Sequence, residues 1–136
     1  MSKINFYNKN REIIMLFSNF YLNKSLEDCL SFAIDVNYSF IKAHYKIECY
    51  LVEFENFIFN LKKLYSRDLK IVYFEPLERQ ITLKFNWVDF GNIVVEVKIH
   101  NQMDSAVIYF KYEIDQSFLP ELIEEISIVL ANINLK

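Results

Sequence analysis

Glycine, proline and cysteine are scarce in this chain of 136 residues, which contains one glycine, two prolines and two cysteines. A single glycine excludes the glycine-rich loops that hold nucleotide phosphates and the G-x-S-x-G turn of serine hydrolases. Because Cys29 and Cys49 stand in strand-like patterns without C-x-x-C spacing, we expect two reduced, partly buried thiols and no disulfide scaffold. The chain also lacks a run of eighteen apolar residues, and residues 1–10 lack the apolar stretch of a secretory signal. We therefore expect a cytoplasmic protein without a membrane partner.

Apolar and aromatic residues, in contrast, are abundant, at 53% and 17% of the chain. This composition excludes a disordered protein, and a chain of this length removes roughly two-thirds of its unfolded surface from water on folding. We expect residues 1–136 to form a single domain, with residues 1–10 as a loosely ordered amino-terminal tail. The net charge of -3 argues against a nucleic-acid partner, because affinity for phosphates comes from clustered lysine and arginine. A basic partner is favoured instead.

Apolar and polar residues alternate along much of the chain, which predicts strands because successive side chains of a strand point to opposite faces. The alternation is clearest over residues 30–36, 41–49, 81–87, 93–99 and 106–114, and segments around 11–20 and 69–74 follow it as well. Short connections between these segments favour antiparallel neighbours. One connection contains Gly91, where we expect a tight turn that needs a positive φ.

Two segments have apolar residues three and four apart, which predicts amphipathic helices. The first covers residues 51–65. The second runs to residue 133, with Asp115 or Ser117 as its cap and Pro120 in its first turn. The order strands, helix, strands, helix predicts an α+β fold with a single layer of mainly antiparallel sheet, about six or seven strands, and two helices. The two halves share this meander-then-helix order without a repeat at the level of residues.

The two histidines and two cysteines are the first candidates for catalytic residues. His44 and His100 lie in the polar phase of their predicted strands, and Cys49 lies in the phase opposite to His44. A nucleophile and its base must be within hydrogen-bond reach, which these phases disfavour. We therefore expect no catalytic residue, no cofactor and no metal, and a protein that is not an enzyme.

The densest group of charges lies near the carboxyl end, where no lysine or arginine occurs between Tyr112 and Asn134. Its five carboxylates are Glu113, Asp115, Glu121, Glu124 and Glu125. One interpretation is a solvated helix face with favourable charges at the helix start. The other is a docking surface for a basic partner, whose association such a field accelerates.

Three aromatic residues, Tyr50, Phe74 and Tyr109, fall in the phase opposite to the main apolar row of their strands. They either lie under a helix on the second face of the sheet or form an amphipathic contact patch. The two readings stay open, and Tyr109 joins the five carboxylates as a candidate partner-binding residue.

Four segments of the chain resemble one bacterial family. They are Leu61-Lys62-Lys63-Leu64-Tyr65, Tyr73-Phe74-Glu75-Pro76-Leu77-Glu78, Gly91-Asn92-Ile93-Val94-Val95-Glu96-Val97 and, most specifically, Phe110-Lys111-Tyr112-Glu113-Ile114-Asp115-Gln116-Ser117-Phe118-Leu119-Pro120-Glu121-Leu122. Together they resemble the WapI-type immunity proteins of bacterial contact-dependent toxin systems, over roughly residues 45–131.

The resemblance implies a non-catalytic protein that binds and neutralises a cognate toxin domain in the cytoplasm. Toxins of this kind are often basic nucleases, which suits an acidic partner. The resemblance transfers no set of binding residues to this chain. The alternative is an adaptor or structural domain that binds another host protein or forms a homodimer.

Overall fold

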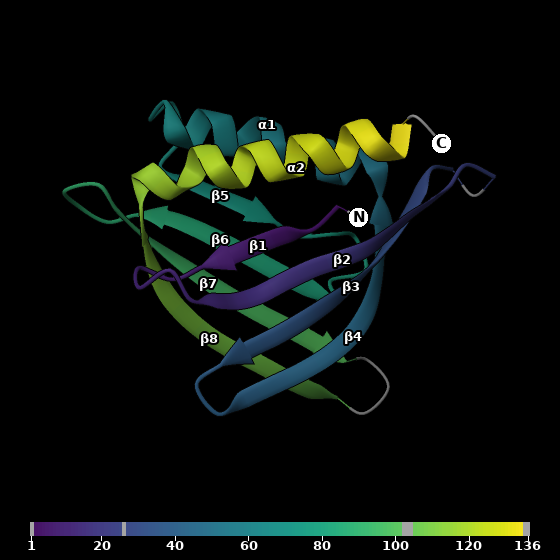
Figure 1. The fold of residues 1–136 in the computed structure, drawn as a ribbon, viewed down its shortest axis with the longest axis horizontal. Helices are drawn as coiled ribbons and strands as arrows, with labels where there is room; N and C mark the ends of the chain where they lie inside the picture. The colour runs from purple at the N-terminus through teal and green to yellow at the C-terminus, as the bar shows by residue number, and fades with distance from the viewer. Residues whose placement is uncertain (1, 26, 102–104, 135–136) are drawn as a thin grey trace.

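The computed structural model describes residues 2–25, 27–101 and 105–134 (Figure 1). The first half contains β1 (Ile4–Tyr7), β2 (Ile13–Asn23), β3 (Cys29–Tyr38), β4 (Ile41–Tyr50) and α1 (Leu51–Tyr65). The second half contains β5 (Ile71–Phe74), β6 (Ile81–Trp87), β7 (Asn92–Asn101), β8 (Ala106–Asp115), a short 3-10 helix η1 (Gln116–Phe118) and α2 (Leu119–Asn134). The predicted α+β class and the order strands, helix, strands, helix are confirmed.

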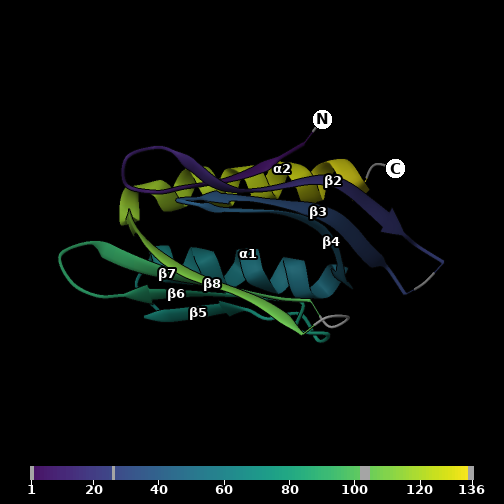
Figure 2. The ribbon, with the colours of Figure 1, turned by 90° about the horizontal axis from the view of Figure 1, so that it is seen from below.

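The strands form two sheets, so the prediction of a single sheet with six or seven strands was wrong. One sheet has the order β1-β2-β3-β4 and the other β5-β6-β7-β8, and every pairing between neighbours is antiparallel. Figure 2 shows the two sheets as separate layers that face each other. The reason is that α1 follows β4 directly, which carries the chain away from the first sheet before β5 begins. Alternation within strands predicts each strand but not which strands share a sheet.

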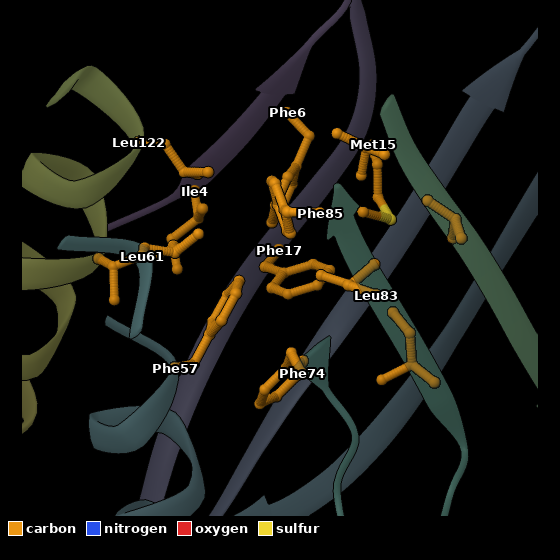
Figure 3. Close-up of a cluster of buried hydrophobic side chains, with 14 of the residues drawn as sticks. Ile4, Phe6, Met15, Phe17, Phe57, Leu61, Phe74, Leu83, Phe85 and Leu122 are labelled. Carbon is orange, nitrogen blue, oxygen red and sulfur yellow. The ribbon is translucent and has the colours of Figure 1, made fainter. Parts of the chain in front are cut away.

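The apolar rows of both sheets point into one core between the layers. Phe17 of β2, Phe74 of β5 and Phe85 of β6 are buried there, and Figure 3 shows side chains from both sheets and both helices pointing toward one another. Phe54 of α1 joins the layers, because its ring centroid lies 5.6 Å from that of Phe32 in the first sheet and 5.5 Å from that of Phe74 in the second. The alternating pattern thus produces two inner faces that cover each other.

Each helix packs beside the first strand of the other half's sheet. In Figure 1, α2 runs along β1, and α1 lies behind it beside β5. The helix that closes one half therefore covers the edge of the other half, and the two helices also contact each other. In the described ranges, neither helix has the length and apolar composition needed to cross a membrane.

The amino-terminal segment is ordered where we expected a loose tail. Residues 4–7 form β1, which pairs with β2, and the side chains of Ile4 and Phe6 are buried in the core. Two alternating apolar residues are too few to predict a strand from sequence, and burial depends on β2 and α2. The loop between β1 and β2, residues 8–12, then reaches the carboxy-terminal half of the chain.

The three aromatics in the opposite phase have different environments. Tyr50 and Tyr109 are exposed on the outer faces of their sheets, whereas Phe74 is buried in the core. In the pattern of β5, Val72 and Phe74 face inward, and Ile71 and Tyr73 face solvent. The side chain of Tyr109 is 51% exposed, so this residue belongs to a solvent-facing surface.

Candidate partner-binding surface

Asp115 lies where β8 ends and η1 begins, and it caps that short helix. Its Oδ1 accepts a hydrogen bond from the backbone N–H of Ser117 at 2.9 Å. This bond favours the charged carboxylate and lowers the pKa of Asp115 from its ordinary value of 3.8. Asp115 was one of the two predicted caps, and the turn from strand to helix accounts for its position.

The loop between β1 and β2 supplies cations to two of the other candidate carboxylates. Arg11 donates from Nη1 to Glu121 Oε2 at 3.0 Å and from Nη2 to Glu121 Oε1 at 3.3 Å. The carboxylate of Glu121 raises the pKa of Arg11, and the guanidinium also lies over the ring of Tyr7 at 4.3 Å. Lys9 Nζ is 3.3 Å from Glu113 Oε2. These pairs offset part of the acidic field expected from the carboxy-terminal segment.

Glu125 connects α2 to β1. Its Oε1 accepts from the backbone N–H of Asn5 at 2.7 Å, and its Oε2 accepts from Asn5 Nδ2 at 3.1 Å. Glu124, one residue earlier, is exposed on the solvent side of the helix. Among the predicted acidic residues of α2, Glu124 therefore has the side chain most open to a partner.

Tyr109 is separated from the acidic residues of α2. It lies on the outer face of β8, where its Oη donates to Glu96 Oε1 at 2.7 Å and thereby lowers the pKa of Glu96. Lys84 Nζ lies 3.6 Å from the other oxygen of that carboxylate. Tyr109 shares this face with Glu113, four residues along the strand, a separation of about 13 Å. The six predicted residues thus divide between a sheet face and a helix.

Lys9 and Arg11 were missed by sequence reasoning, because Lys9 falls in the segment taken for a tail and Arg11 at the start of a predicted strand. Arg11 and Glu121 are 110 positions apart in the chain, and no local pattern signals their pairing. A second acidic region was also missed, because the residues that form it are far apart in the sequence. It is a hollow of about 430 Å³ near the end of β4, and its lining residues include Glu27, Glu48, Glu53 and Glu78.

The thiols and histidines form no recognisable catalytic arrangement in the described part of the chain. Both cysteines are free, and burial raises the pKa of Cys49 to about 12. Cys29 is half-exposed, and its pKa is raised by partial burial and by the carboxylate of Glu48. His44 Nδ1 lies 2.6 Å from Asp35 Oδ1 on the solvent side of the first sheet. Across residues 2–25, 27–101 and 105–134, no group of three or more histidine, cysteine, aspartate or glutamate side chains could hold a metal ion.

The fold is similar to a solved structure described as crystal structures of Trypanosoma bruciei MRP1/MRP2. The TM-score is 0.50 at 9% sequence identity, and the alignment covers 94% of this chain and 81% of that chain. The structure of the plant transcriptional regulator PBF-2 aligns with a TM-score of 0.43 at 8% identity, over 94% of this chain and 78% of that one. At such low identity the first similarity concerns the fold alone.

A comparison with curated proteins finds no match for this chain. A family model described as the immunity protein WapI-like family matches residues 27–134. The match includes α1, the whole second half and the segment from Phe110 to Leu122 on which the resemblance chiefly depends. It extends the resemblance seen in the sequence toward both ends, and the chain belongs to the WapI-like immunity protein family.

Proposed function

We propose that this chain is a cytoplasmic immunity protein that neutralises one cognate toxin domain by binding it. The observation that carries the proposal is the family match over residues 27–134. Membership of an immunity protein family supports inhibition by binding, without chemistry. A basic toxin, such as a nuclease, fits the net charge of -3.

The acidic residues of α2 and β8 are the proposed docking surface for such a basic partner. The five carboxylates outnumber the cations near them, which are Lys9 and Arg11 of the β1–β2 loop and Lys111 on the outer face of β8. The field therefore stays negative even though Lys9 and Arg11 pair with Glu113 and Glu121. Glu124 is the exposed acidic residue of α2 and should dominate the contact that this helix makes with the toxin. Charges of this kind raise the rate of association more than they change the lifetime of a complex.

The first test is co-expression of this chain with the toxic carboxy-terminal domain encoded immediately upstream, measuring growth and complex recovery together. Rescue of growth with a stable complex is the expected result. Rescue of growth without a complex would contradict inhibition by binding. Failure to rescue growth would favour the alternative function, an adaptor or structural domain.

The acidic surface is tested by Glu124→Lys, with Glu55→Lys as its matched control. Both residues are exposed on helices, and both substitutions change the net charge by the same amount. We expect the change at Glu124 to slow association with the toxin domain several-fold at low salt, and the change at Glu55 to have a much smaller effect. Equal effects of the two substitutions would show that only the net charge of the chain affects association. The acidic residues of α2 would then not belong to the docking surface.

A further inference from the structure

The loop between β6 and β7 holds a phenylalanine ring almost entirely in water. The side chain of Phe90 is 97% exposed, and its backbone has a φ of 45°. This left-handed conformation is unfavourable for a residue with a large side chain, and asparagine or glycine would adopt it more readily. Phe90 is thus unfavourable for the free domain both in its backbone and in its exposed ring, and such combinations are typical of functional sites.

The loop that presents Phe90 is fixed by hydrogen bonds on both sides. Val88 N donates to Asn92 O at 2.9 Å, and Asn92 N donates to Asp89 O at 2.7 Å. Gln116 N of η1 donates to Gly91 O at 2.9 Å, and the Gln116 side chain lies 3.6 Å from the place where a Cβ on Gly91 would be. The backbone that carries the ring is therefore preorganised, so binding at this loop costs less backbone conformational entropy.

A hollow of about 570 Å³ adjoins the loop, and Phe90 itself borders it. Its other lining residues include the ring of Trp87, the cations Arg67 and Lys70 and one carboxylate, Asp89. The Arg67 guanidinium lies 5.0 Å from the centre of the Trp87 ring and donates to Gln116 Oε1 at 3.3 Å. These two contacts hold the planar, charged guanidinium of Arg67 in the lining of the hollow that Phe90 also borders.

We propose that Phe90 is the anchor of the toxin-binding interface, inserting its ring into an apolar pocket of the toxin domain. This inference rests on the proposed function. Because the ring projects outward, the partner must supply the concave surface, which a folded protein domain offers. In this arrangement Arg67 and Lys70 face a carboxylate at the rim of the toxin's pocket. Asn92, at the end of the same loop, pairs with Asp115 of β8. The acidic residues of β8 and α2 therefore begin next to the loop and face the basic surface of the toxin around the pocket. The central aromatic residue of an interface commonly contributes most of its binding energy.

The test compares Phe90→Asn with a matched control, Phe40→Asn. Phe40 lies in the turn between β3 and β4 and is 91% exposed. In Figure 1 this turn is well separated from the loop between β6 and β7. Asparagine accepts the left-handed backbone at position 90, so Phe90→Asn should melt at or above the temperature of the wild type. We expect it to weaken binding of the upstream toxin domain by roughly 10- to 100-fold, while Phe40→Asn binds like the wild type.

A charge reversal tests the basic side of the same interface. Lys70→Glu should weaken toxin binding several-fold at low salt, whereas Lys42→Glu, at an exposed position of β4 in the other sheet, should have no such effect. If the wild-type chain forms no complex with the toxin domain, both the proposed function and the role of Phe90 as an anchor are refuted. If the wild type binds and Phe90→Asn binds equally well, the anchor alone is refuted. A shift of Phe90→Asn from dimer to monomer on sizing chromatography, with toxin affinity unchanged, would assign the ring to a second copy of this chain and also overturn the proposal.

Discussion

Replacing Phe54 with alanine should destabilise the whole domain, because this one ring connects both sheets. Phe54 is fully buried in α1, and its ring centroid lies within about 6 Å of four other phenylalanine rings, two of them 5.6 and 5.5 Å away in opposite sheets. Truncation of a buried phenylalanine to alanine costs about 3–5 kcal/mol, from lost transfer energy and from the cavity left behind. A domain of this size has a total stability of about 5–15 kcal/mol, so the substitution removes a large fraction of it.

Urea unfolding followed by circular dichroism measures this loss, with Phe59→Ala as the matched control. Phe59 is on the same helix but is 56% exposed, and Lys63 Nζ lies over its ring at 4.7 Å. We expect a loss of about 4 kcal/mol for Phe54→Ala, equivalent to a fall of about 15 °C in Tm, and less than about 1 kcal/mol for Phe59→Ala. If Phe54→Ala fails to fold, Phe54→Leu should show a smaller loss in the same direction. A loss below about 2 kcal/mol at position 54, or equal losses at both positions, would refute the role of α1 as the link between the sheets.

Three further predictions concern groups that the fold places in specific environments. Glu125→Ala should lower the unfolding free energy by about 1–2 kcal/mol, because it removes the acceptor of two hydrogen bonds from β1, and chemical denaturation measures this. The pKa of Asp115 is lowered by its bond from Ser117, so its stabilising contribution is present above the unfolded value and disappears as the pH falls through the folded value. Asp115→Asn should therefore flatten the fall of stability below about pH 4, and an unchanged profile would contradict the cap. At pH 8, a thiol reagent should modify half-exposed Cys29 before Cys49, whose pKa is raised to about 12 by burial, and equal rates would contradict the burial of Cys49.

Local patterns were sufficient to predict most of the elements. Alternation ends at Tyr50 and helical spacing begins at Leu51, and the structure changes from β4 to α1 at the same point. Gly91 has the positive φ, 81°, that its position in a tight turn requires. These features depend on side-chain direction and backbone sterics within a few residues, so a single sequence contains the information.

The assembly of the elements depends on contacts between distant residues, which local patterns do not contain. The strand at Ile4–Tyr7 is one example, because its two buried side chains need β2 and α2 to cover them. The division into two sheets is another. Alternation identifies the apolar row of each strand, but which strands share a sheet depends on how one half packs on the other.

The same limit explains why charge in the sequence is a poor guide to charge on the surface. The carboxy-terminal segment contains five carboxylates and no lysine or arginine before its last residue, yet Arg11 and Lys9 reach two of those carboxylates from the other end of the chain. Carboxylates that hold the protein's own loop or cap its own helix are constrained by folding, and their replacement changes stability and binding together. Glu124 and Phe90 differ in this respect, because Glu124 is exposed and Phe90 opposes the local backbone preference. Substitutions at these two positions can therefore separate toxin recognition from folding, and they are the most informative positions for locating the interface.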